Sequence, residues 1–167
     1  MSTTITRSVR LDLPLAAVAD LLRTPEHAVR RLEAAGREDP VLVRFAGSGD
    51  GVRIETRYFG RRDELPGWMA SRFPQHGPEN HRTEVWTLGP ATLTAVVVVE
   101  SVEGRGGVRG TYTVVPEGEG CRWELAAEVS VPLPVIGRRV EKVVAATAAR
   151  VHAGEAAAMT AGAVRIR

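Results

Sequence analysis

The sequence predicts an α+β fold, in which a curved antiparallel β-sheet of about seven strands wraps around one long C-terminal helix. Three observations support this prediction. Strand patterning with turn residues between the strands fills most of residues 3–131, two short helical patterns follow the first strand, and helical periodicity runs from residue 133 to residue 159. A helix of that length spans roughly 40 Å. Only the strands before it offer enough apolar surface to cover it.

The first strand and the two helices after it come first in the chain. Residues 3–13 alternate apolar and polar side chains, which is typical of a half-buried strand. Pro14 ends this strand, and apolar residues at helical spacing just beyond it predict a first short helix. A second short helix begins at Thr24-Pro25, with Thr24 as its expected cap.

Strand patterning then returns in most of the remaining chain. Turns rich in Gly and Pro separate the apolar runs, so we expect neighbouring strands to pair as antiparallel hairpins. In the last run Trp123, Leu125 and Ala127 alternate with polar residues, which indicates one face on the core and one in water. The six predicted strands are 41–46, 52–59, 79–88, 91–102, 108–115 and 121–131.

Residues 65–77 interrupt the strand pattern. This segment contains several Pro and Gly residues together with Trp68, Met69 and Phe73. Large apolar side chains in a segment rich in helix and strand breakers indicate a lid or a short helix packed over an opening.

Length and composition limit the architecture and the partners. The 167 residues are enough for one domain, which we place at residues 1–162, with a frayed tail at 163–167. With 22 Lys and Arg against 20 Asp and Glu, the net charge is only +2, which argues against nucleic-acid binding. The N-terminal residues lack the apolar run of a signal peptide, and no apolar run is long enough to span a bilayer. We therefore expect a cytoplasmic protein without stable membrane insertion.

Motifs for metal, nucleotide or covalent chemistry are not recognisable in the sequence. The Gly-rich turns fit neither a phosphate-binding loop nor a dinucleotide fingerprint. His76, Glu79 and His81 lack a known ligand spacing, so we predict no metal and no cofactor. Cys121 is the one cysteine, which excludes an intramolecular disulfide, and it has no neighbouring His to activate it. No catalytic residue is assigned.

Three stretches carry a resemblance to a known family. They are Leu65-Pro66 before the lid segment, Glu84-Val85-Trp86 in a strand, and residues 131–137 (VPLPVIG) at the entry to the long helix. With this order of elements, the chain resembles the START-like (SRPBCC) superfamily, which has the helix-grip fold and includes the birch-pollen-allergen type. More narrowly, it resembles a bacterial family of unassigned function there. The likeness covers almost the whole chain and implies a cavity between sheet and helix, which in many members holds lipids, sterols, polyketides or hormones.

The residues themselves also favour such a cavity. The apolar stripe of the long helix is rich in Val, Ala and Thr, which are too small to fill the space under a curved sheet. The charged residues of this helix, Arg138, Arg139, Glu141, Lys142 and Arg150, are expected to face elsewhere. Strand parity and the helix stripe predict this lining, covered by the lid residues Trp68, Met69 and Phe73: Ile54, Thr56, Tyr58, Trp86, Val97, Val99, Tyr112, Val114, Trp123, Leu125, Ile136, Val140, Val144, Thr147 and Val151.

A mostly apolar lining with a few polar groups favours non-covalent binding or transport of a small hydrophobic or amphipathic molecule over catalysis. One alternative is an enzyme similar to polyketide cyclases or dehydratases, with Tyr58, Tyr112, His81 or a buried Arg such as Arg57 as acid–base candidates. A second alternative is a protein-interaction module that binds through residues 68–73. The sequence leaves the identity of the ligand and the oligomeric state open.

Overall fold

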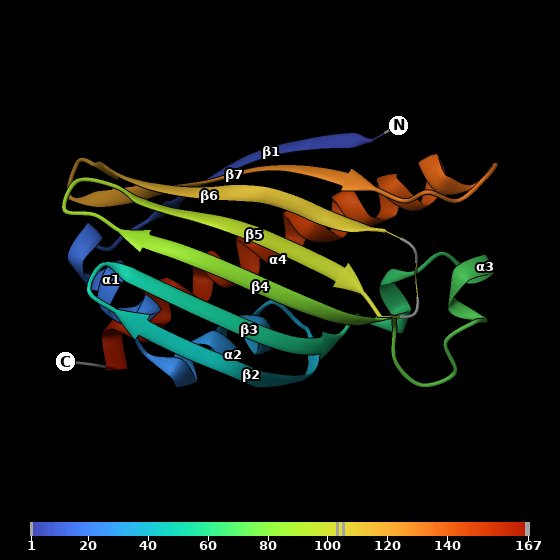
Figure 1. Ribbon diagram of the computed structural model, residues 1–167, viewed down its shortest axis with the longest axis horizontal. Helices are drawn as coiled ribbons and strands as arrows, with labels where there is room; N and C mark the ends of the chain where they lie inside the picture. The colour runs from blue at the N-terminus through green and yellow to red at the C-terminus, as the bar shows by residue number, and fades with distance from the viewer. Residues whose placement is uncertain (1, 103, 105, 166–167) are drawn as a thin grey trace.

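The computed structural model describes residues 2–102, 104 and 106–165, with side chains up to residue 162. Seven strands form one antiparallel sheet in the order β1-β7-β6-β5-β4-β3-β2, so the predicted fold class is confirmed (Figure 1). The strands are β1 (Thr3–Leu11), β2 (Glu38–Ser48), β3 (Gly51–Phe59), β4 (Glu79–Leu88), β5 (Leu93–Ser101), β6 (Gly107–Glu117) and β7 (Gly120–Ser130). The helices are α1 (Leu15–Leu22), α2 (Pro25–Ala34), the 3-10 turn η1 (Arg62–Glu64), α3 (Gly67–Ala70) and α4 (Gly137–Arg165).

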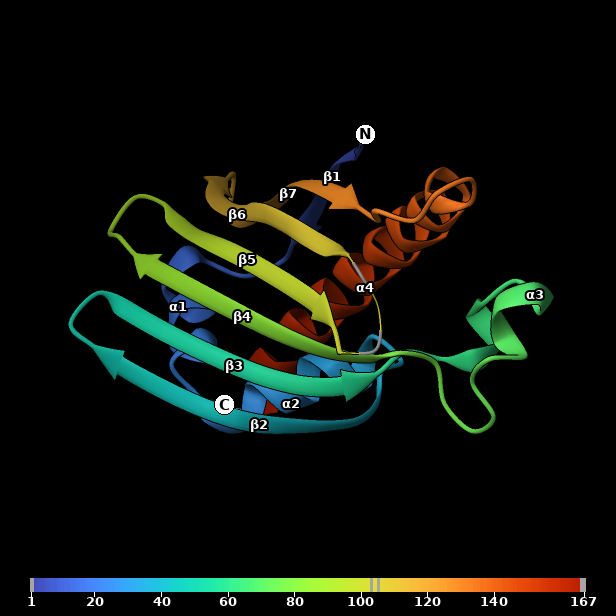
Figure 2. The same cartoon turned by 45° about the vertical axis from the view of Figure 1, so that its right-hand side comes forward.

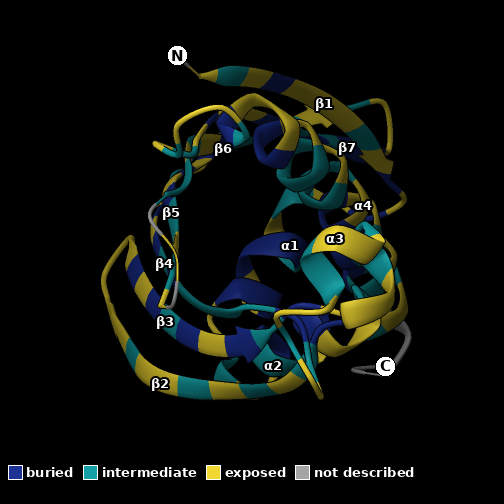
Figure 3. Cartoon of the chain, turned by 90° about the vertical axis from the view of Figure 1, so that its right-hand side faces the viewer, coloured by how far each residue is buried: buried dark blue, intermediate teal, exposed yellow. Residues whose placement is uncertain are grey.

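The sheet is strongly curved, and α1, α2 and α4 lie on its concave side (Figure 3). Its edges are β1 and β2, which lie at opposite ends of the curve (Figure 2). The alternation read from the sequence holds along β7, where Trp123, Leu125 and Ala127 are buried and the residues between them are more exposed. Apolar burial on this inner face supplies the main favourable free energy of folding.

The short helices follow their predicted starts, and Thr24 occupies the predicted N-cap position of α2 without making a side-chain capping hydrogen bond. Pro25 occupies the first position of α2, where its missing N–H costs no hydrogen bond. The Thr24 side chain does not cap the helix. Its hydroxyl donates instead to the carbonyl oxygen of Asp20, 3.0 Å away, and this hydrogen bond is to the last turn of α1.

The long helix α4 begins at Gly137, four residues later than predicted. Pro132 and Pro134 lack N–H donors, and Pro134 disfavours helical geometry at the residue before it. Residues 131–137 instead form a hydrogen-bonded corner, with the Leu133 N–H donating to the Val131 carbonyl at 2.8 Å. At its other end the helical backbone continues to Arg165. Residues 166–167 of the predicted tail lie outside the described residues.

Glu141, expected to face away from the interior, is only 2% exposed. Its carboxylate accepts hydrogen bonds from the Val131 N–H and from the Thr3 hydroxyl, both at 3.1 Å. These bonds attach the start of α4 to β1 and to the corner before the helix. None of the helices in the described part of the chain has the length and apolar character needed to cross a lipid bilayer.

Candidate ligand-binding cavity and buried charge cluster

An inner cavity of about 150 Å³ lies between the concave sheet and the first half of α4. Apolar side chains from β5, β7 and α4 form most of its wall, among them Val97, Leu125 and Val151. Its polar and charged lining comes from eight side chains. These are Arg37, Tyr58, Arg61, Glu64, Asn80, Arg82 and Tyr112, joined on α4 by Thr147.

An outer cavity of about 500 Å³ adjoins the inner one, beneath the segment that contains α3. Trp68, Met69 and Phe73 line it from the lid side, and Ile136 and Val140 line it from the start of α4. Several residues line both cavities, so the two are neighbours along the sheet and helix; these residues are Met69, Pro78, Asn80, Val99, Val108 and Val144. The outer cavity has a largely apolar lining.

The lid segment contacts α4 through an aromatic and a cationic side chain. The guanidinium carbon of Arg139 lies 5.8 Å from the centre of the Trp68 ring, within the range of a cation–π interaction. Trp68 is nevertheless 39% exposed, and α3 has only four residues. The segment therefore closes over the outer cavity with little buried surface to fix it there.

The structure divides the predicted lining residues into three groups. Eight line the inner cavity: Tyr58, Val97, Val99, Tyr112, Leu125, Val144, Thr147 and Val151. Around the outer cavity lie the three lid residues together with Ile136, Val140, Val99 and Val144. The remaining five, Ile54, Thr56, Trp86, Val114 and Trp123, are buried on the inner face but line neither cavity as described. A role in ligand contact stays a prediction for all of them.

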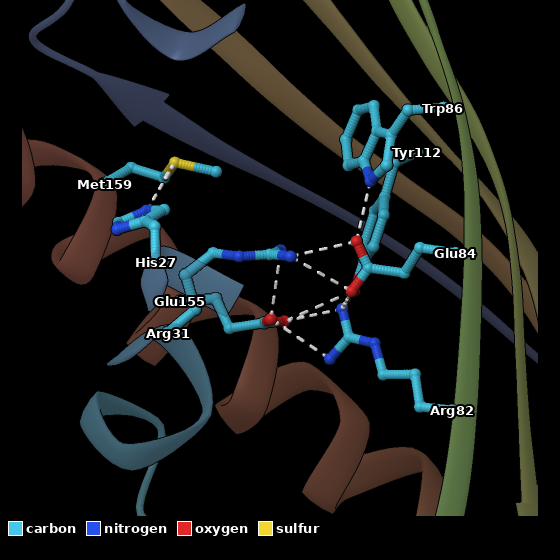
Figure 4. Close-up of polar contacts among 8 residues, drawn as sticks. All are labelled: His27, Arg31, Arg82, Glu84, Trp86, Tyr112, Glu155 and Met159. Atoms are coloured by element: carbon cyan, nitrogen blue, oxygen red, sulfur yellow. Dashed lines mark hydrogen bonds and ion pairs between the residues drawn. The ribbon is translucent and has the colours of Figure 1, made fainter. Parts of the chain in front are cut away.

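Four charged side chains that were not among the predicted site residues lie buried together, and one of them, Arg82, lines the inner cavity (Figure 4). We call Arg31, Arg82, Glu84 and Glu155 the charge quartet; each side chain is at most 3% exposed. Glu84 pairs with Arg31 at 3.0 Å and with Arg82 at 2.7 Å. Glu155 pairs with Arg31 at 3.3 Å and with Arg82 at 3.0 Å. The formal charges cancel, and the quartet joins α2, β4 and α4.

Two aromatic side chains add hydrogen bonds to the quartet, while the Nε atoms of Arg31 and Arg82 have no partner among the described residues. The Trp86 indole N–H donates to Glu84 at 2.7 Å. The Tyr112 hydroxyl accepts from Arg82 at 3.1 Å and donates to Glu155 at 3.4 Å. Burial alone raises the pKa of Glu84, but the Arg31 and Arg82 guanidinium groups outweigh it and hold the pKa at about 2. Glu84 is therefore an anion at neutral pH.

Two histidines next to the quartet are buried and neutral. Burial, reinforced by the positive charge of Arg31, lowers the pKa of His27 to about 4. Burial, reinforced by Arg82, lowers the pKa of His152 to about 4 as well. His27 Nε2 lies 3.3 Å from the Met159 sulfur, and Figure 4 marks this contact with a dashed line. The His152 ring stacks on Tyr112 with 5.7 Å between centroids.

Other predicted candidates lie away from the interior. Arg57, suggested as a buried arginine, has a side chain that is 54% exposed and pairs with Glu79 at 3.3 Å; that suggestion is wrong, because its odd parity in β3 points it outward. His81 faces Arg57 across the β3–β4 pairing. Among the described residues, no three His, Cys, Asp or Glu side chains are grouped to hold a metal ion. Cys121 is buried, and burial raises the pKa of its thiol.

The quartet residues on β4 and α4 lie at the same periodic positions that predicted the apolar lining residues. In β4, the inward parity of Trp86 extends two and four residues back to Glu84 and Arg82. In α4, the stripe that contains Val151 continues at four-residue spacing to Glu155 and then to Met159. The chain thus places charged residues at core positions, which a search for apolar residues passes over.

The curved sheet, the two helices after β1 and the long C-terminal helix together define the helix-grip fold of the START-like superfamily. The chain belongs to the family described as "protein of unknown function (DUF2505)", whose model matches residues 6–161. A search of curated proteins finds no match.

Solved structures from several organisms share this fold. The protein TTHA0849 of Thermus thermophilus is 19% identical with a TM-score of 0.64, covering 96% of this chain and 99% of its own. A START superfamily protein from Mycobacterium smegmatis is 12% identical with a TM-score of 0.57, and the match covers 98% of this chain and 99% of that protein. Norcoclaurine synthase from Thalictrum flavum, in complex with dopamine and hydroxybenzaldehyde, is 15% identical with a TM-score of 0.58. The match covers 100% of this chain and 89% of that protein. At such identities the likeness shows the fold alone.

Proposed function

We propose that this protein binds a small hydrophobic or amphipathic molecule non-covalently in the adjoining inner and outer cavities. The observation that carries the proposal is the mostly apolar space between the sheet and the first half of α4, with a few polar groups at its inner end. Small-molecule sites have this composition, since apolar walls supply binding free energy and isolated polar groups fix orientation.

The size of the helix side chains supports the same proposal. Val143, Val144, Thr147 and Ala148 face the inner cavity from consecutive turns of α4. Larger residues at these positions would occupy the space between the helix and the curved sheet. Their small volume keeps that space open along the helix, and we propose that the predicted lining residues at the two cavities contact the ligand.

The fold neighbours are compatible with this proposal. The norcoclaurine synthase structure contains dopamine and hydroxybenzaldehyde, so one protein of this fold binds small ring-containing molecules. We propose the same general class of ligand for this chain, namely a small organic molecule.

An acid–base enzyme, the alternative suggested by the sequence, has less support from the geometry. Tyr58 and Tyr112 do line the inner cavity. Burial raises the pKa of each phenol, so both stay protonated at neutral pH. Protonated phenols can orient a ligand by hydrogen bonds, which is sufficient for a binding protein.

Substitutions that fill the cavities test the proposal. Val144 lines both cavities and Val151 lines the inner one, so we expect Val144→Trp and Val151→Trp to abolish binding of the neutral dye N-phenyl-1-naphthylamine. The matched control is Ala146→Trp, on the exposed side of the same helix, which should bind the dye like the wild type. Dye fluorescence gives binding, and circular dichroism checks folding. Undiminished binding by both cavity variants would show that the site lies elsewhere.

Native mass spectrometry of the purified protein, followed by denaturing extraction, identifies the natural ligand class. A species of defined mass that leaves on denaturation is the expected result. Its absence from protein carrying Val144→Trp, together with its presence in the Ala146→Trp control, would assign it to the cavities. A species retained equally by all variants would contradict the cavity as its site.

A further inference from the structure

We infer that the inner cavity receives an uncharged, hydrogen-bonding end of the ligand about the size of one ring, and that Tyr58 and Asn80 bind it. This inference rests on the proposed function and narrows its ligand class. It excludes ligands that would place a carboxylate, phosphate or ammonium group in the inner cavity. The observations behind it are the pairing of every charged side chain in the lining and the neutral polar groups that remain.

The first of these pairings is the charge quartet. Arg82 lines the inner cavity, but its guanidinium group already pairs with both Glu84 and Glu155. An anionic ligand would have to compete with two buried carboxylates for this one cation. The quartet as a whole is electrically neutral, so it offers no net attraction to a ligand of either charge.

The second pairing is between Arg37 and Glu64, which both line the cavity. The Arg37 Nη2 atom lies 2.7 and 2.8 Å from the two oxygens of Glu64, and the Arg37 side chain is 3% exposed. The fourth charged lining residue, Arg61, pairs with Asp63 at 2.9 Å through its Nε atom. Each charge on the wall is therefore matched within the protein.

Without a free counter-charge, burying a charged group in this cavity is costly. The desolvation of a single ion amounts to several kcal/mol unless a partner compensates it. Separation of either the Arg37–Glu64 pair or the charge quartet to provide one would leave another ion unpaired, and the Arg61–Asp63 pair is largely exposed to water and so is a weak partner for a buried group. An uncharged group avoids both costs.

Tyr58 and Asn80 supply neutral hydrogen bonds at this place. The two residues are direct partners in the β3–β4 pairing, and both line the inner cavity. Tyr58 is 6% exposed, and its hydroxyl has no hydrogen-bond partner among the described residues. Asn80 donates its amide N–H to the Pro78 carbonyl at 2.9 Å, which leaves its side-chain oxygen as an acceptor. Tyr112, by contrast, already uses its hydroxyl within the quartet.

The size of the cavity limits what can enter it. A volume of about 150 Å³ is enough for one benzene ring. The adjoining outer cavity, at about 500 Å³ and with an apolar lining, leaves room for the rest of the molecule. The matching ligand has a ring-sized end with a hydroxyl or carbonyl group and a larger apolar body beneath the lid segment.

Four probes with one shared body test this inference: 4-butylphenol, 4-butylbenzoate, 4-butylbenzylamine and butylbenzene. At pH 7.4 the phenol is neutral, whereas the acid and the amine are charged. Titration of ¹⁵N-labelled protein by NMR gives each affinity and shows whether amides around the cavity respond. We expect 4-butylphenol to bind tightest and the two charged probes to bind at least about 100-fold more weakly.

Variants identify the group that makes the hydrogen bond. Tyr58→Phe should weaken 4-butylphenol about tenfold and leave butylbenzene unchanged, because only the phenol loses a hydrogen bond. Asn80→Ala should likewise weaken the binding of 4-butylphenol and leave that of butylbenzene unchanged. The matched control is Thr87→Val, at an exposed position of β4 outside both cavities, which also removes a hydroxyl but should retain the preference for the phenol over butylbenzene.

The possible outcomes separate this inference from the proposed function. If a charged probe binds at the cavity within tenfold of the phenol, the inference is overturned while the proposed function stands. If Tyr58→Phe and Asn80→Ala weaken the phenol no more than butylbenzene, neither residue binds the polar end and the inference fails. If none of the four probes and no N-phenyl-1-naphthylamine binds, the proposed function fails and the inference falls with it.

Discussion

The two halves of α4 lie against the same sheet but have different neighbours. Residues 137–151 face the two cavities with small apolar side chains such as Val140, Val144 and Val151. Residues 152–162 pack on α1 and α2, where Glu155 pairs with Arg31 and Met159 contacts His27. The space on the concave side of the sheet is thus filled where α1 and α2 pack beside α4, and it stays open where these two helices are absent.

Small residues have opposite effects in the two halves. In the first half, valines and alanines leave space because only the curved sheet lies opposite them. In the second half, Gly154 lets α2 come so close that an added Cβ would lie 2.7 Å from the Cα of Ala35. This approach brings Arg31 within reach of Glu155. Whether a small side chain makes a cavity or a close contact depends on the element opposite it.

The largest expected effect comes from breaking the charge quartet. Glu155→Gln removes one of the two carboxylates of the quartet and leaves Arg31 and Arg82 with Glu84 alone. Loss of one partner from a buried ion pair costs about 3–5 kcal/mol, because the remaining charge is left uncompensated. We expect the free energy of unfolding in urea to fall by that amount. Glu33→Gln, an exposed position on α2, is the control and should change it by less than about 0.5 kcal/mol. Equal stability of the two variants would contradict the role of the quartet.

The next effect is a loss of stability in mild acid. His27 and His152 have an ordinary pKa of 6.5 and a folded pKa of about 4. Below pH 6.5 the unfolded chain binds protons that the folded protein does not bind until about pH 4. Stability is therefore complete above pH 6.5 and falls as the pH drops towards 4, by about 3 kcal/mol for each histidine. Glu84 acts in a lower window, since its contribution is lost as the pH falls from 4.5 through about 2.

Urea unfolding at pH 7.5, 6, 5 and 4.5 measures this pH dependence. His152→Phe keeps an aromatic ring next to Tyr112 and Trp123 but cannot bind a proton. It should remove about half of the loss between pH 6.5 and 4.5. Val85→Phe, at an exposed position of β4, is the control and should retain the wild-type pH dependence. If the free energy of unfolding of His152→Phe depends on pH as steeply as that of the wild type, this histidine does not remain neutral in the folded protein.

A smaller loss is expected when the approach of α2 to α4 is blocked. Gly154→Ala places a methyl group 2.7 Å from the Cα and 3.2 Å from the Cβ of Ala35, so the two helices must move apart. Overpacking costs about 1–3 kcal/mol, and the better helix propensity of Ala returns up to about 1 kcal/mol. We expect a net loss of about 1 kcal/mol in urea unfolding. Gly67→Ala is the control, because nothing lies within 4 Å of its added Cβ. A gain in stability by Gly154→Ala would show that the helices are not in close contact.

Much of the fold could be predicted from local patterns, because they reflect local physics. Alternation in β7 follows directly from the two faces of a strand, and turn residues mark the hairpins. The start of α4 was misplaced because the helical spacing of its apolar residues extends back into the Pro132-Pro134 corner. There, backbone restrictions outweigh the apolar pattern.

The buried charges could be predicted only in part. Parity places Arg82 and Glu84 on the inner face of β4, but a charged residue at such a position is buried only if a partner is supplied. Those partners are Arg31 and Glu155, which are 124 residues apart along the chain and meet only in the folded protein. A single sequence carries no local signal that Arg31 and Glu155 will be in contact in the folded protein. The polar end of the candidate site was therefore harder to predict than its apolar walls.

The smallest effect on stability is expected at the open end of the molecule, in the lid segment. Trp68→Ala removes a ring that is 39% exposed and a cation–π contact with Arg139, which is worth about 0.5–1 kcal/mol at such sites. The free energy of unfolding should change by no more than this amount. Dissociation of N-phenyl-1-naphthylamine, measured by stopped-flow fluorescence, should nevertheless become several-fold faster, because part of the cover of the outer cavity is lost.

Val43→Ala, at a half-exposed position on the edge strand β2, is the control for Trp68→Ala and should alter neither quantity. An unchanged dissociation rate in Trp68→Ala would mean that the segment does not cover a bound molecule. A stability loss as large as that of Glu155→Gln would instead make Trp68 part of the core. The expected result, a change in dissociation rate with little change in stability, requires that one end of α4 holds the fold together while the other end leaves space for a ligand.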